Sequence, residues 1–147
     1  SGLGEQALVQ PWQRMLAPGD VARFAAVAAT TRRAFVNSRT AVGEAITVAV
    51  AEFAAVPDCR RRVIDISGDG PENAGNGVGA ARRAAIAAGI GINAIAIEES
   101  GLPSPVSAFY ERLVVTPGGF VMTARGLGDY ARTLRAKLLR ELEKPVG

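Results

Sequence analysis

The sequence predicts a single α/β domain in which helices flank a parallel β-sheet. Short apolar segments rich in isoleucine and valine alternate with longer segments of helical periodicity, which is typical of parallel sheets with right-handed crossovers. Of the 147 residues, 48% are hydrophobic but only 5% are aromatic. We therefore expect a core of small aliphatic side chains on helices packed against a sheet. The chain, residues 1–147, is long enough for one such core.

The first part of the chain is predicted to contain one short strand and two helices. Residues 7–9 are a candidate strand before a Pro-Trp pair. Asp20 follows a Pro-Gly turn and can cap a helix that extends to about residue 31. A second helix is expected over residues 41–56, where Pro57 ends it.

The remainder supplies three strands separated by helices. Strands are expected at residues 63–66, 92–97 and 120–124, and the first two are apolar enough to be buried on both faces. Helices are expected at residues 77–88, 104–113 and 127–143. The last helix should pack through an apolar stripe made of Leu127, Ala131, Leu134, Leu138 and Leu142. Three strands are few for so many helices, so part of the sheet is missing or comes from another chain.

Composition and charge argue against several function classes. The chain has no histidine and one cysteine, so most nucleophilic and acid/base arrangements and any intrachain disulfide are excluded. The net charge of +3 comes from scattered arginines without interleaved aromatic residues, which argues against nucleic acid as a partner. No apolar run reaches the roughly 18 residues of a membrane span. We expect a binding protein and not an enzyme, with no catalytic or organic-cofactor residues.

Asp69 is the leading site residue because it lies just beyond the strand expected at residues 63–66. Ligands of open α/β sheets bind at the carboxyl ends of the strands, and a carboxylate there can hold Mg²⁺ or Mn²⁺ directly or through water. Thr40, at the start of the helix expected over residues 41–56, could place its hydroxyl on the same cation. The alternatives are that Asp69 caps the following turn and that Thr40 caps the helix amides.

Two neighbouring features have simpler interpretations. Asp65 shares its strand parity with Asp69, so its carboxylate should be partly buried, need a donor and have a structural role. Gly75, Gly77 and Gly79 form a glycine-rich loop between a strand and a helix, which is typical of phosphate-binding loops. Their spacing differs from the dinucleotide fingerprint and no Lys-Ser/Thr pair follows. A nucleotide-binding enzyme domain is therefore the least favoured function.

Three segments, residues 40–46, 62–73 and 91–97, together resemble von Willebrand factor A-type domains, in particular an uncharacterised bacterial subfamily. The resemblance implies a three-layer, Rossmann-like parallel sheet flanked by helices, with a metal-ion-dependent adhesion site. Thr40 matches the threonine of that site and Asp69 matches its aspartate, whereas its Asp-x-Ser-x-Ser motif has no counterpart here. The resemblance thus implies that the N-terminal strands are missing and that the single domain is incomplete.

For function, the resemblance implies a protein-interaction module of the adhesion type. A Mg²⁺ or Mn²⁺ ion with an incomplete set of protein ligands would accept an acidic residue from a protein partner. The alternative, which the missing motif favours, is a metal-free structural or assembly domain. The strand at residues 63–66 would keep an open apolar edge, so a second copy in a homo-oligomer or a companion fragment should cover it. Export signals are frequent in related proteins, which points weakly to the bacterial periplasm.

Overall fold

The computed structural model describes residues 2–32, 35, 39–75, 77–99 and 105–143. A parallel three-stranded sheet lies at its centre, with strand order β1-β2-β3. The strands are β1 (Arg62–Gly68), β2 (Ile90–Glu98) and β3 (Val121–Arg125). The predicted α/β class with a parallel sheet is confirmed.

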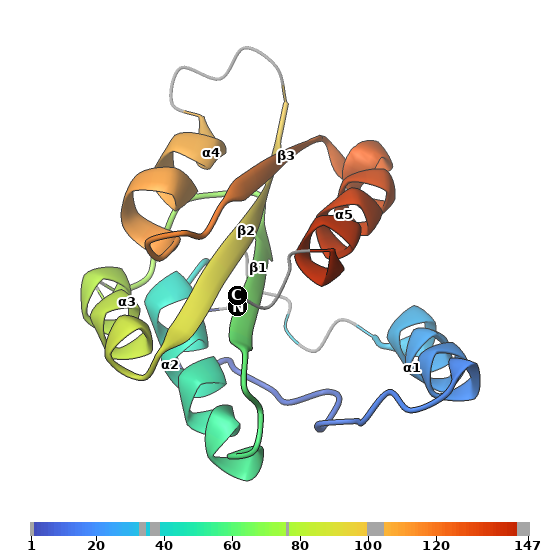
Figure 1. Cartoon of the computed structure of the whole chain (residues 1–147). Coiled ribbons are helices and arrows are strands. Elements are labelled where there is room, and N and C mark those ends of the chain that lie inside the picture. Colours follow the sequence, from blue (N-terminus) through green and yellow to red (C-terminus); the bar gives the residue numbers. More distant parts are fainter. Residues whose placement is uncertain (1, 33–34, 36–38, 76, 100–104, 144–147) are drawn as a thin grey trace.

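Helices flank both faces of this sheet (Figure 1). One face carries α2 (Val42–Glu52) with the short 3₁₀ turn η1 (Phe53–Ala55), α3 (Val78–Ala87), and α4 (Val106–Phe109), which continues into the π-helical turn η2 (Tyr110–Val114). The other face carries α5 (Leu127–Leu142), and α1 (Pro18–Thr30) lies farther out on that side. No helix in the described part of the chain is long and apolar enough to cross a membrane.

The apolar core lies between the sheet and the face that carries α2, α3 and η2. Its fully buried side chains include Ile46, Ile92, Val114 and Tyr110. Helices α2 and α3 approach each other closely, because a Cβ atom at Gly43 would collide with the backbone of Gly77. This contact gives Gly43 a packing role, as a glycine that allows α2 to touch the start of α3.

The two predictions of burial on both faces have different outcomes. β2 is buried along most of its length, as its apolar sequence predicts. For β1 the prediction is wrong, because Asp65 and Ser67 are exposed and only Ile64 is buried. β1 is an edge strand, and its face toward α5 is only partly covered.

The N-terminal segment differs from the prediction in one respect. Residues 7–9 form no strand, and the segment instead crosses the end of α2, where the Trp12 Nε1–H donates to the main-chain oxygen of Glu52 at 2.9 Å. Asp20 does cap the first helix, as predicted, but from its third position. Its Oδ2 accepts from the main-chain N–H groups of Leu16 and Ala17, both at 2.9 Å.

The remaining helices after residue 40 are present with shifted ends. The helix expected at residues 104–113 begins at Val106, after Pro105, while Ser104 lies outside the described residues. The final helix runs over Leu127–Leu142, close to its predicted range.

The predicted apolar stripe of α5 is wrong. Leu127 is 78% exposed, Leu138 43% and Leu142 82%, and Ala131 is exposed as well, whereas Leu134 is half-buried. The buried residues of this helix are all polar or charged: Thr133, Lys137 and Glu141. The polar side of the helix faces the sheet, because Asp65 on β1 and Asn93 on β2 pair with its buried residues.

Candidate functional site

Asp69 lies at the carboxyl edge of the sheet, immediately after β1. It lines a pocket of about 310 Å³ with Glu98 and Glu99 at the end of β2, Gly126 and Leu127 after β3, and Ile97. All three strands therefore end at this pocket, which is the edge where open parallel sheets bind ligands. The predicted position of Asp69 is confirmed.

Two side chains, Tyr110 and Glu98, shape the surroundings of Asp69. The buried Tyr110 places its hydroxyl against Gly68, where a Cβ atom would collide with it. Burial, together with the negative charge of Asp69, raises the pKa of Tyr110 to about 12. The Tyr110 hydroxyl, which like that of any ordinary tyrosine is protonated at neutral pH, lies under the end of β1.

Glu98 is already engaged within the protein. Its two carboxylate oxygens accept from the main-chain N–H of Ser107 at 3.0 Å and from the Ser107 hydroxyl at 3.1 Å. These bonds tie the end of β2 to the first turn of α4, where a negative charge also interacts favourably with the helix dipole. Glu98 therefore serves as a structural link, while Asp69 and Glu99 contribute their charge to the pocket.

The loop after Asp69 is joined to the loop that carries Thr40. The Thr40 main-chain N–H donates to Asn73 Oδ1 at 2.7 Å, and its carbonyl accepts from the N–H groups of Asn73 and Ala74 at 3.0 and 3.1 Å. Glu72 accepts from the N–H of Gly43 at 3.0 Å and so caps α2 from another loop. The structure thus brings together the two loops that carry the predicted site residues.

The loops of Asp69 and Thr40 are hydrogen-bonded to each other, but the two side chains do not line the same pocket. Thr40 is not among the described residues that line the pocket of Asp69. The first residue before α2 is Ala41, so the alternative role of Thr40 as the helix cap is taken by Glu72 instead. Within the described ranges, no group of three or more cysteine, aspartate or glutamate side chains is arranged to hold a metal ion. The cation at Asp69 and Thr40 stays a prediction.

A comparison with protein families gives one result. The family model described as Protein of unknown function (DUF1194) matches residues 1–146. The chain belongs to this family. Comparisons with curated proteins and with solved structures found no match.

This DUF1194 member contains a second polar cluster, between α5 and the sheet. Lys137 is fully buried and forms ion pairs with Asp65 and, at 2.7 Å, with Glu141. Asn93 on β2 donates from Nδ2 to Glu141 at 2.6 Å and accepts at Oδ1 from the N–H of Phe120 at 3.1 Å. The predicted need of Asp65 for a donor is confirmed, and Lys137 is that donor.

The two carboxylates of this cluster respond differently to the same ammonium group. Burial raises the pKa of Asp65 above its ordinary value, and Lys137 offsets this only in part. Burial also opposes ionisation of Glu141, but the hydrogen bonds from Lys137 and Asn93 outweigh it and lower the pKa of Glu141. Sequence reasoning missed this cluster, although polar residues at positions 133, 137 and 141 recur every four residues and mark one helical face.

Proposed function

We propose that this chain is a protein-interaction domain that works through assembly with another polypeptide. The observation that carries the proposal is the set of large apolar side chains that the chain exposes on its N-terminal segment, α1 and α5.

This DUF1194 member exposes large apolar side chains in three regions of the chain. The large apolar side chains exposed there are Leu3, Leu8, Val9, Trp12, Met15 and Leu16 of the N-terminal segment, Val21, Phe24 and Val27 of α1, and Leu127, Leu138, Leu139 and Leu142 of α5. Helix α1 has no buried residue at all. Single exposed leucines are ordinary, but extended apolar surfaces mark interaction sites.

Sedimentation velocity and a hydrophobic dye test this function together. We expect the chain either to associate reversibly or to bind the dye anilinonaphthalene sulfonate as a monomer. Both responses remove exposed apolar surface from water, which is favourable. Leu138→Glu on α5 should weaken whichever response occurs. Leu113→Glu is the matched control, since Leu113 is 53% exposed on η2, on the opposite side of the sheet. A monomer that binds no dye would contradict the proposal.

The second candidate is metal-assisted binding at the carboxyl edge of the sheet. It rests on the resemblance to von Willebrand factor A-type domains with their Rossmann-like sheet, and on the placement of Asp69 in a pocket with Glu98 and Glu99. Mg²⁺ and Mn²⁺ prefer about six oxygen ligands. Asp69 and Thr40 would supply two of them, and water and an acidic side chain of a protein partner would supply the others.

Calorimetric titration with Mn²⁺ and Mg²⁺ separates the two candidates. If the metal site exists, wild-type protein binds the ion saturably, Asp69→Asn abolishes the binding and Asp58→Asn preserves it. Asp58 is a suitable control because it is an exposed aspartate that pairs with Arg14. The absence of saturable binding by the wild-type chain would reject the metal candidate and leave metal-free assembly.

A further inference from the structure

The outer edge of β1 is open within the described part of the chain. β1 occupies one end of the strand order and pairs only with β2 among the described strands. In any strand, the main-chain groups of alternate residues point toward opposite neighbours. About half of the N–H and C=O groups of β1 therefore face away from the sheet, where they can pair with another strand.

A cavity of about 530 Å³ borders this edge. Its walls come from four parts of the chain: the N-terminal segment, Phe24 of α1, the C-terminal half of α2 with Phe53, and Val63, Ile64 and Asp65 of β1. The small side chains of Ala45 and Ala49 on α2 leave room in it.

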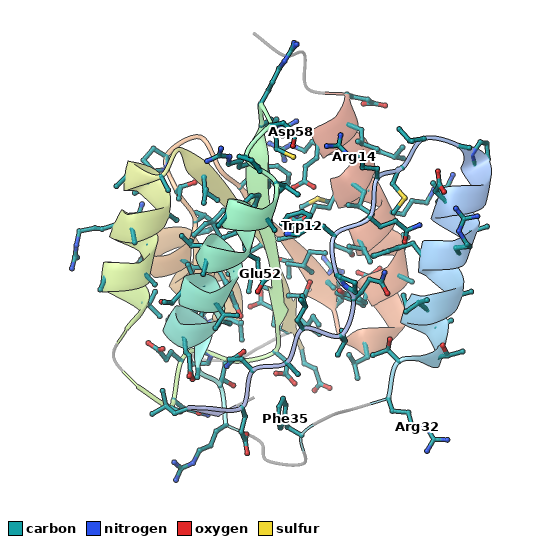
Figure 2. The ribbon with its side chains drawn as sticks, turned by 90° about the horizontal axis from the view of Figure 1, so that it is seen from below. Trp12, Arg14, Arg32, Phe35, Glu52 and Asp58 are labelled. Atoms are coloured by element: carbon teal, nitrogen blue, oxygen red, sulfur yellow. The ribbon has the colours of Figure 1, made fainter. Side chains whose placement is uncertain are left out.

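The N-terminal segment spans this cavity without filling it. Trp12 holds the segment to the end of α2, because its ring packs 5.1 Å from that of Phe53 and its Nε1–H donates to Glu52. Arg14 holds it near the start of β1 through an ion pair with Asp58. Figure 2 views the molecule toward the β1 edge and shows the segment passing in front of the sheet, with Trp12 beside Glu52 and Arg14 beside Asp58.

The chemistry of the cavity selects among occupants. Its walls are largely apolar and aromatic, and two acidic side chains line it: Glu52, which is half-buried, and Asp65, which is already paired with Lys137. An apolar segment fits such walls, and a basic side chain is favoured over an acidic one. The unpaired edge of β1 adds main-chain donors and acceptors, which an extended polypeptide satisfies in series and a compact small molecule does not.

We propose that the β1 edge and this cavity form a docking site for an extended, apolar strand of a partner polypeptide that carries a basic residue. The strand pairs with the main chain of β1 and places alternate side chains in the cavity. This inference rests on the proposed interaction function and names its surface and its class of partner.

A synthetic strand peptide tests the site directly. The probe is a blocked nine-residue peptide, Val-Lys-Val-Thr-Val-Thr-Val-Lys-Val, and the control peptide carries N-methyl groups on its three central residues. Trp12 is the only tryptophan of the chain and lines the cavity, so its fluorescence reports occupancy. We expect a saturable change with the probe and at least tenfold weaker binding of the control, which cannot pair through its main chain.

Two variants locate the binding. Val48→Arg places a bulky cation at the cavity wall, where Val48 is 39% exposed, and should weaken peptide binding at least tenfold. Ile86→Arg is its match on α3, where Ile86 is 41% exposed and outside the cavity, and should bind like the wild type. Thermal unfolding of both variants establishes that they fold.

Each outcome decides the proposal. Binding of the two peptides with equal affinity would mean that the cavity takes apolar groups without strand pairing. No saturable signal, or full binding by Val48→Arg, would overturn the docking site. If dye binding or association persists in that case, the broader interaction function stands and only this surface is wrong.

Discussion

The two faces of the sheet are held by different forces. On the side of α2, α3 and η2, fully buried aliphatic residues such as Ile46 and Ile92 form an ordinary apolar core. On the side of α5, a buried lysine with two carboxylates faces the sheet while leucines point outward. The hydrophobic effect is non-directional, whereas charge-assisted hydrogen bonds such as those of Lys137 require a defined geometry. The comparison indicates that α5 is positioned by its polar face, which leaves its apolar face exposed.

Removal of Lys137 should have the largest effect on this comparison. Lys137→Met keeps the aliphatic shape but leaves the Asp65 and Glu141 carboxylates without their counter-ion. Breaking a buried ion pair in this way typically costs 3–5 kcal/mol, and we expect about 3 kcal/mol because Asp65 is one-third exposed. Urea unfolding of the wild type and the variant measures this loss of stability. Adding Glu141→Gln to the variant should cost less than the sum of the single changes, and simple additivity would argue against a coupled cluster.

The pH dependence should be smaller and should separate the two carboxylates. The pKa of Glu141 is lowered in the folded state, so its contribution is present above its ordinary pKa near 4.5 and is lost as the pH falls through the folded value. The pKa of Asp65 is raised, so its contribution has the opposite sign: it is present below 3.8 and is lost as the pH rises through the folded value.

Urea titrations at several pH values reveal this difference. The stability gap between wild type and Glu141→Gln should narrow as the pH falls from neutrality into the acid range. A gap that stays constant or widens would show that Glu141 is not held in its charged form by Lys137 and Asn93.

The smallest effect is expected on the outer face of α5. Leu138→Ala should change the free energy of unfolding of the monomer by no more than about 0.5 kcal/mol, since Leu138 is 43% exposed. A core leucine would cost 2–5 kcal/mol. Chemical unfolding at a concentration where the chain is monomeric distinguishes the two. A loss in the core range would restore the apolar stripe as the face toward the sheet.

Much of the architecture could be predicted because it depends on local pattern. Apolar runs gave the three strands, helical spacing gave the helices, and the end of a strand located Asp69 at the correct edge of the sheet. The need of Asp65 for a donor also followed from strand parity. The identity of that donor did not, because Lys137 lies 72 residues away and meets Asp65 only in the fold.

The errors have a shared physical origin. Helix periodicity predicts an apolar stripe on the inner face of α5, but the periodicity shows only that two faces differ and not which one packs inward. Similarly, the apolar sequence of β1 predicted burial on both faces, which fails at an edge strand. Residues 7–9 have the composition of a strand but are held elsewhere by Trp12. In each case, burial and position depend on contacts with distant parts of the chain, which local sequence pattern does not reveal.

The open edge of β1 can be examined most directly by amide hydrogen exchange, residue by residue, on the monomeric chain. Central β2 should be protected throughout, whereas β1 should show alternation, with the amides directed away from β2 exchanging much faster than their neighbours. Addition of the strand peptide should slow those same amides. Uniform protection along β1, equal to that of β2 in the free monomer, would contradict an open edge and the docking site built on it.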